Sequence, residues 1–176
     1  AVKHLTSRLT DPDETIQHAG IVTGLGGYAG HSHKYKKKGG SGYLFRTATV
    51  QDFSAVTGAC LLVRASVYDE VGGLDEQFAV AFNDVDFCLR VRDAGYRIAW
   101  TPYAELIHYE SKSRGGDEKD PVKAARFAAE QQRLYTIHGK ENILDDPYYN
   151  PNLTRDREDF SESDDLRRLK EGRVTV

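Results

Sequence analysis

Residues 83–95 carry the start, stop and burial signals of an amphipathic helix, and this segment constrains the fold more than any other. Asn83 or Asp84 can cap its beginning, acidic residues occupy its first turn, and Gly95 can end it. Its apolar residues form one stripe: Val85, Cys88, Leu89 and Val91. Because such a stripe is typical of a helix packed on a core, we expect a helix here with this face buried.

A second helix is predicted further along the chain. Asp120 can cap it, Pro121 suits its first position, and Gly139 ends it after about His138. A short helix is also predicted over residues 67–71, capped by Ser66 and ended by the two glycines that follow.

Extended segments are predicted between and before these helices. Residues 16–22 and 96–100 have the character of strands, the second of which Pro102 should break. Residues 104–108 form another short extended segment, and the apolar run 55–64 is either a buried strand or the edge of a core helix. Helices and strands thus alternate, but with too few parallel-strand units for a full doubly wound sheet. The sequence predicts part of a larger α/β domain, a mixed sheet with flanking helices.

Two segments show neither the helical nor the strand periodicity of apolar residues. Residues 24–42 are rich in Gly and Lys and are predicted to be a long loop, and the pattern dissolves into Asp, Pro, Asn and Tyr after Leu144. We therefore expect one domain over residues 1–144 and an extended acidic tail over 145–176 that wraps or is mobile.

The composition limits the class of protein. With 39% hydrophobic and 29% charged residues it is that of a soluble globular chain, and no apolar run approaches the ~18 residues of a membrane span. A net charge of −3 argues against a nucleic-acid partner. Cys60 and Cys88 lie in apolar stretches and are expected to be free thiols, which favours a cytoplasmic setting. The lack of an initiating Met suggests a fragment of a longer protein.

An ordered series of short motifs runs from about Asp13 to Phe160: QHAG at 17–20, TGAC at 57–60, VGGLDEQF at 71–78, NDVDFCLR at 83–90, GY at 95–96, Pro102, His108, SKSRG at 111–115 and DPYYNPNL at 146–153. Each motif alone is weak, but the ordered set is specific. It resembles the C-terminal, acceptor-side half of family-2 inverting glycosyltransferases, especially the rhamnosyltransferase-like bacterial members. The resemblance implies a partial GT-A fold, the nucleotide-diphospho-sugar transferase fold.

The resemblance also assigns roles to individual residues. It implies that Asp84 is the general base, which removes a proton from an acceptor hydroxyl. It implies that His108 contacts the metal, Mg²⁺ or Mn²⁺, or the diphosphate that this metal neutralises. It places substrate contacts at Thr57, Gly58, Ala59, Asn83, Asp86 and Arg114. The family commonly has Glu-Asp where this chain has Asn83-Asp84, so a charged acceptor contact expected from the first position is in doubt.

The same resemblance implies the partners. They are a nucleotide sugar donor, UDP- or dTDP-linked, and a glycan or lipid-linked glycan acceptor, with no nucleic acid. The metal would be shared with an upstream nucleotide-binding half, whose Asp-x-Asp motif is not recognisable here. Asp11–Asp13 lies in a turn-rich stretch and Asp84–Asp86 opens a helix. We therefore expect the 176 residues alone to be inactive, and a cytoplasmic location that leaves peripheral association with the inner membrane face open.

Plainer interpretations stay open for each residue. Asp84 can be only a helix cap and Asp86 only a first-turn acid, and His108 can be a hydrogen-bonded structural histidine. Arg114 can be a solvated loop charge, and Trp100 is more often core than a sugar platform.

The loop from His31 to Lys38 is also open to several interpretations. His31 and His33 are a weak metal signal, and the lysines at 34 and 36–38 suit either phosphate or a solvated loop. At the level of the whole chain, the alternatives are a non-catalytic carbohydrate-binding or scaffold domain and, less favoured, a nucleic-acid-binding module.

Overall fold

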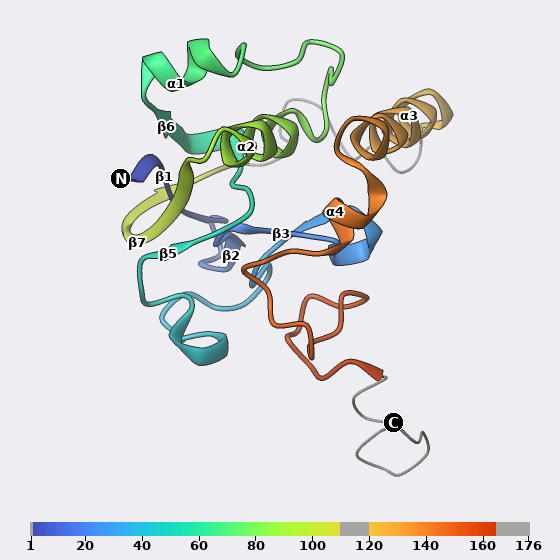
Figure 1. Cartoon of the computed structure of the whole chain (residues 1–176). Coiled ribbons are helices and arrows are strands. Elements are labelled where there is room, and N and C mark those ends of the chain that lie inside the picture. The colour runs from blue at the N-terminus through green and yellow to red at the C-terminus, as the bar shows by residue number, and fades with distance from the viewer. Residues whose placement is uncertain (1, 110–119, 165–176) are drawn as a thin grey trace.

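The computed structural model describes residues 2–109 and 120–164 of the chain, which form a curled mixed sheet with helices against it (Figure 1). At its centre, β1 (Val2–Thr10) pairs in parallel with β7 (Arg97–Ile107). The other edge of β1 is shared by β6 (Leu61–Val63) and β2 (Ile16–His18), both antiparallel to it. The fifth strand, β5 (Gln51–Asp52), pairs antiparallel with β7.

A second, two-stranded sheet lies beside the first. It is the hairpin of β3 (Ile21–Thr23) and β4 (Ala29–His31), joined through a 3₁₀ turn at Leu25–Gly27. The prediction of one loop over residues 24–42 was therefore wrong at β4, because backbone pairing with β3 builds a strand where the side chains show no alternation. The prediction of a single strand over residues 16–22 was wrong as well, because Gly20, with φ at +95°, separates β2 from β3.

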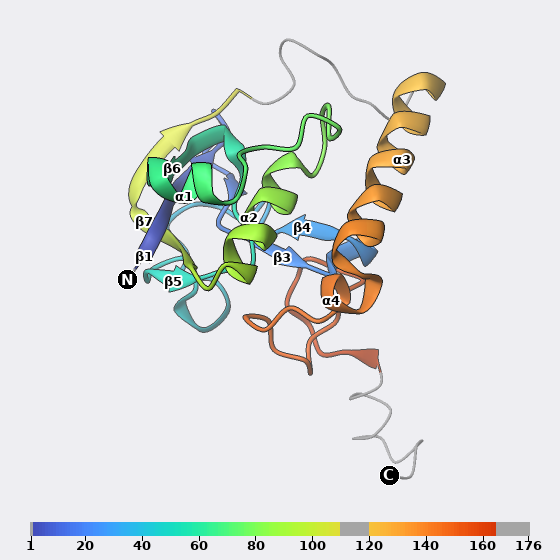
Figure 2. The same ribbon diagram turned by 45° about the horizontal axis from the view of Figure 1, so that its top comes forward.

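The described residues also contain four α-helices and two further 3₁₀ turns: α1 (Ala65–Glu70), α2 (Asn83–Asp93), α3 (Pro121–His138), α4 (Lys140–Leu144), η2 (Tyr43–Phe45) and η3 (Gly58–Cys60). Helix α2 lies between strand β7 and helix α3, as Figure 2 shows, and contacts both. No helix among the described residues has the length and hydropathy to cross a membrane.

The predicted ends of the two long helices are largely confirmed. Asp120 caps α3 by accepting hydrogen bonds from the next two free amides, Pro121 is its first residue and Gly139 ends it. Gly95, with φ at +83°, ends α2. The cap of α2 was predicted wrongly, because Phe82 stands at the N-cap and Asn83 and Asp84 are already helical. Ser66 likewise lies inside α1, which Arg64 precedes.

The core confirms the predicted stripe of α2. Val85, Cys88, Leu89 and Val91 are all buried, together with Phe87. Trp100 is fully buried beside Phe53, with their rings edge-on and centroids 6.4 Å apart, so its core interpretation is confirmed. Both cysteines are free thiols.

Two strand predictions were wrong for identifiable reasons. Pro102 does not break β7, because the register against β1 jumps from Ser7–Thr101 to Arg8–Glu105 and leaves Pro102 in a bulge, where its missing N–H costs no ladder bond. The run 55–64 is neither a buried strand nor a core helix along its length, since it turns at η3 and leaves Leu62 68% exposed in β6.

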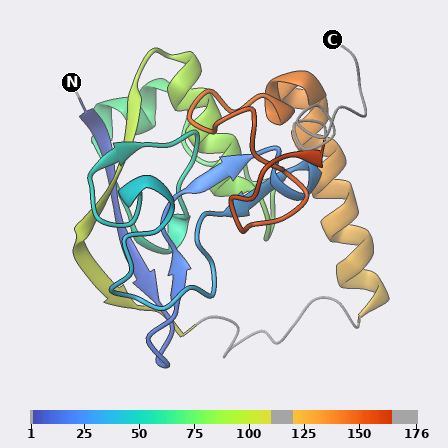
Figure 3. The same ribbon diagram turned by 90° about the horizontal axis from the view of Figure 1, so that it is seen from below.

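The described part of the tail, residues 145–164, runs beside the β3–β4 hairpin (Figure 3). Tyr149 and Leu153 are buried in the same core as the helices. Buried Asp146 accepts a hydrogen bond of 2.8 Å from the amide of Thr23, and the carbonyl of Arg155 accepts one of 2.8 Å from Gly26. These contacts fix the tail next to the pocket described below.

Candidate active site

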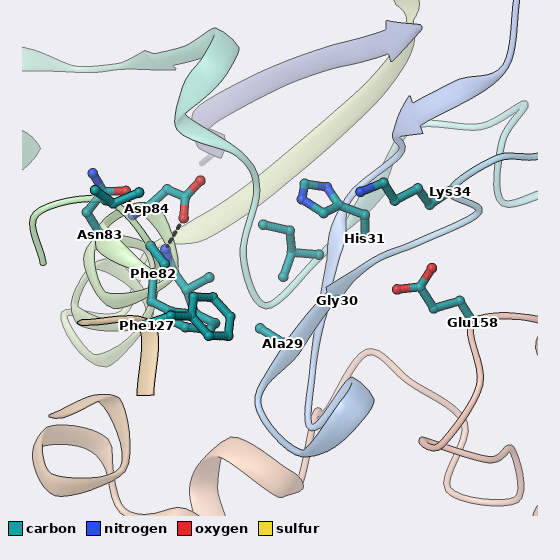
Figure 4. A pocket seen from close by; sticks show the side chains of 13 residues that line it. Ala29, Gly30, His31, Lys34, Phe82, Asn83, Asp84, Phe127 and Glu158 are labelled. Atoms are coloured by element: carbon teal, nitrogen blue, oxygen red, sulfur yellow. Dashed lines mark hydrogen bonds between the residues drawn. The ribbon is translucent and has the colours of Figure 1, made fainter. Parts of the chain in front are cut away.

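An open pocket of about 440 Å³ lies between the start of α2 and the β3–β4 hairpin (Figure 4). One wall is formed by Phe82, Asn83 and Asp84, with Phe127 of α3 beside them. The opposite wall is formed by β4, Lys34 and Glu158 of the tail. The pocket therefore joins segments from the middle, the beginning and the end of the chain.

Asp84 is held in one orientation by backbone donors. Its Oδ2 accepts a hydrogen bond of 2.9 Å from the amide of Gly58, and its Oδ1 accepts one of 2.8 Å from the amide of Val85. Burial raises the pKa of the Asp84 carboxyl, and these amides offset part of that rise. A fixed carboxylate with a raised pKa, open to a pocket, has the properties of a general base.

The turn at residues 57–59 presents the donor to Asp84. The hydroxyl of Thr57 accepts from the amide of Ala59 at 3.3 Å and so caps the short turn η3. This cap leaves the amide of Gly58 directed at Asp84. Four of the residues that the motif resemblance assigned, Thr57, Gly58, Ala59 and Asp84, thus meet at one place.

Asn83 lies beside them in the pocket wall. Its Oδ1 accepts a hydrogen bond of 2.8 Å from the amide of Asp84, which satisfies one of the unpaired amides of the first helical turn.

The loop before α2 is held by a residue that sequence analysis missed. Glu130 of α3 is only 4% exposed, and its two carboxylate oxygens accept from the amides of Val80 at 3.1 Å and Ala81 at 2.9 Å. Phe82 follows with φ at +62°, a strained value for a bulky residue. A signal existed: Glu130 shares the helical face of Phe127 and Leu134, where a carboxylate needs partners.

Asp86 does not reach this pocket. Two residues along a helix turn the side chain by roughly 200°, so Asp86 points away from the side on which Asp84 lies. It is 1% exposed and bonds to His138 Nε2 at 2.8 Å and Arg90 Nη2 at 2.6 Å. Burial pushes the pKa of Asp86 up, but the hydrogen bonds from His138 and Arg90 outweigh it and lower that pKa. This cluster ties α2 to α3.

The wall opposite Asp84 contains the half-buried His31, which contacts the fully buried His18 behind it. His31 Nδ1 lies 3.0 Å from Nδ1 of His18, and burial lowers the pKa of His31 to about 4 and that of His18 well below its usual value. Both imidazoles are therefore neutral at pH 7. Burial raises the pKa of Glu158, and nearby Lys34 counteracts that rise.

His108 lies elsewhere in the described structure. Its Nδ1 is 2.5 Å from Oε1 of Gln17, and its amide donates to the carbonyl of Thr10. It does not line the pocket of Asp84. Within residues 2–109 and 120–164, no three His, Cys, Asp or Glu side chains are grouped to hold a metal ion. Arg114 lies outside the described residues.

Comparison with known proteins gives relatives that are much longer than this chain. The chain is 49% identical over 155 residues to the uncharacterized protein y4gI of Sinorhizobium fredii, covering 88% of this chain and 17% of that protein. It is 36% identical over 148 residues to the O-antigen biosynthesis protein RfbC of Myxococcus xanthus, covering 84% and 11%. It is 38% identical over 80 residues to the N-acetylglucosaminyl-diphospho-decaprenol L-rhamnosyltransferase of Mycobacterium tuberculosis, covering 46% and 24%.

The chain thus spans less than a quarter of the length of each of these relatives. No solved structure matches it significantly. Residues 13–134 match the family model described as glycosyl transferase family group 2. Because this match covers more than half of the chain, the motif resemblance is confirmed and the chain belongs to glycosyl transferase family group 2.

Proposed function

We propose that this segment forms the acceptor-binding half of an inverting glycosyltransferase, with Asp84 as its general base. The observation that carries the proposal is the carboxylate of Asp84, oriented by the amides of Gly58 and Val85 and facing an open pocket. The names of the relatives, an O-antigen biosynthesis protein and a rhamnosyltransferase, support transfer of a hexose in surface glycan synthesis.

The reaction follows from this placement. The acceptor hydroxyl gives its proton to Asp84 while its oxygen forms a bond to the anomeric carbon of the donor sugar. The bond from that carbon to the diphosphate breaks, and the nucleoside diphosphate leaves with the electron pair. Attack from the face opposite the leaving group inverts the anomeric centre. The raised pKa makes Asp84 a better proton acceptor than an ordinary aspartate.

The donor in this proposal is a UDP- or dTDP-linked hexose and the acceptor a glycan or lipid-linked glycan. The described residues do not form a complete metal site, so no step of the proposal depends on a metal bound to them. A requirement for Mg²⁺ or Mn²⁺, and contact of His108 with the metal or diphosphate, remain predictions from the resemblance.

The experiment is nucleoside diphosphate release by the native-length protein that contains this segment. A panel of sugar nucleotides is offered with glycan acceptors, with and without Mn²⁺, to wild type and Asp84→Asn. Asp93→Asn is the matched control, because Asp93 is exposed at the end of the same helix and outside the pocket.

We expect Asp84→Asn to lower acceptor-dependent release by about 10²-fold or more and Asp93→Asn to leave it unchanged. Equal release by wild type and Asp84→Asn would reduce Asp84 to a structural residue. Glycan binding without release would favour a carbohydrate-binding domain instead.

A further inference from the structure

A second pocket, of about 400 Å³, adjoins the pocket of Asp84. Five residues line both pockets: Ala29, Gly30, Phe82, Phe127 and Glu158. Two cavities with shared walls on this scale are parts of one groove, which begins at Asp84 and continues over α3 and the tail. Each part has a volume within the ~300–1,000 Å³ range of small-ligand sites.

The groove is lined by aromatic rings in series. Phe127, 37% exposed, lies with its ring centroid 5.3 Å from that of Phe82, and the ring centroid of Tyr28 lies 6.3 Å from that of Phe82. Tyr28 in turn stacks on Tyr135 at 4.6 Å, which fixes its ring. Aromatic faces held in this way offer flat apolar platforms for the C–H faces of sugar rings.

Polar groups with spare hydrogen-bonding capacity stand beside these rings. Gln131 of α3 lines the second pocket. Its side-chain amide forms no hydrogen bond with other groups in the described part of the chain. The carboxylate of Glu158 points into the groove, as Figure 4 shows. A Cβ on Gly30 would lie 2.6 Å from Cδ2 of Leu25 and 3.2 Å from Oε1 of Glu158, so the glycine leaves room for both side chains at the junction of the two pockets.

The groove is lined by more acidic than basic side chains. Asp84, Glu158 and Asp156 contribute carboxylates. Lys34 of the first pocket and Arg157 of the second contribute cations, and Arg157 is paired with Asp159 at 3.5 Å. His31 is neutral at pH 7 because burial lowers its pKa to about 4. Acidic side chains thus outnumber basic ones, which favours a neutral ligand whose hydroxyl groups donate hydrogen bonds to carboxylates over a nucleoside diphosphate.

We propose that the groove holds two adjoining saccharide subsites, and that the acceptor is a glycan of at least two sugar residues. The sugar that reacts lies beside Asp84, and the next sugar lies in the second pocket against Phe82, Phe127 and Gln131. This inference rests on the proposed function for the role of the first pocket. The tail is then part of the acceptor site, because it supplies Glu158 and the neighbouring wall.

The test compares binding of methyl monosaccharides with that of the corresponding methyl disaccharides. Glucose, galactose, N-acetylglucosamine and rhamnose are each used in both forms with the native-length protein, by saturation-transfer NMR and calorimetry. The variants are Gln131→Ala and, as matched control, Gln132→Ala, because Gln132 is the exposed neighbour that lines neither pocket.

We expect at least one disaccharide to bind about tenfold more tightly than its monosaccharide, with saturation transferred to both rings. Gln131→Ala should reduce that advantage by about threefold to tenfold, and Gln132→Ala should keep it. If no disaccharide binds more tightly than its monosaccharide, or if both variants behave alike, the second subsite is refuted.

The release assay separates this inference from the proposed function. A disaccharide preference without nucleoside diphosphate release would keep the subsites and refute the transferase. Nucleoside diphosphate release without any disaccharide preference would support the transferase and refute the second subsite.

Discussion

The amide of Gly58 donates a hydrogen bond of 2.9 Å to Oδ2 of Asp84, across 26 positions of sequence. This hydrogen bond has two effects on Asp84, the general base that we propose. It fixes the direction of the carboxylate into the pocket, and it favours the charged form against the burial that raises the pKa of Asp84. The turn at residues 57–59 thus helps to set the pKa of Asp84.

Replacing Gly58 by Pro removes this donor and should shift the pH dependence of transfer. Thr57 is extended and Gly58 begins a 3₁₀ turn, so both positions accept the substitution. Loss of the N–H raises the pKa of Asp84 further, so the acidic limb of the kcat/KM profile should move to higher pH by roughly one unit. Gly58→Ala is the control, because it keeps the N–H and its Cβ would lie 3.5 Å from Cβ of Asp84, an ordinary contact. Identical profiles for the two variants would contradict this role.

Glu130→Gln should lower kcat, because it weakens the hydrogen bonds that hold the loop before α2. The amide side chain keeps one acceptor oxygen but turns an NH₂ group toward a backbone N–H, so either Val80 or Ala81 loses its partner. We expect a loss of about 1–3 kcal/mol in unfolding free energy and a lower kcat, while the acidic limb stays in place because Asp84 keeps its own donors. Denaturant unfolding measures the change in stability, and a pH–rate profile measures kcat and the position of the acidic limb. Glu141→Gln, on the exposed face of α4, should change neither.

Asp86→Asn tests whether Asp86 contacts substrate or supports the fold. Its carboxylate is buried between Arg90 and His138, so the change should cost about 3 kcal/mol of stability and leave the KM for the acceptor unchanged. The lowered pKa means that this stabilisation is present above the unfolded-state pKa and is lost as the pH falls through the folded-state value. A raised KM with unchanged stability would instead support the substrate contact that the motif resemblance implies.

Three histidines with lowered pKa values should make the fold sensitive to mild acid. Burial lowers the pKa of His31 and His33 to about 4 and that of His18 well below its usual value, whereas unfolded histidine titrates near pH 6.5. Below that pH the unfolded chain binds protons that the folded chain does not, so stability should fall from about pH 6.5 toward 4.

Urea unfolding at pH 7.5, 6 and 5 measures this dependence. His33→Gln, which keeps an acceptor for the amide of Tyr43, should make the slope shallower. An unchanged midpoint from pH 7.5 to 5 would show that these histidines are not held neutral.

The expected partial GT-A fold, a mixed sheet with flanking helices, is confirmed in the described residues. The helix signals that the structure confirms are local: the cap at Asp120, the glycines that end α2 and α3, and the stripe buried on α2 all act within a few residues. The caps predicted for α1 and α2 were wrong. The ordered motifs were sufficient to identify the family, because the set is specific although each motif alone is weak.

The amino-acid sequence by itself determined the two long helices, their buried faces, the family and the presence of Asp84 at a helix start. Only the tertiary structure decided that β1 is the central strand and that Pro102 sits in a bulge. It also decided that Gly58 bonds to Asp84, that Glu130 holds the loop before α2, and that Glu158 lies across the pocket. The physical reason is distance along the chain. A strand, a bulge or a buried carboxylate is stabilised by partners tens of residues away, and no local pattern records which partner the folded chain brings near.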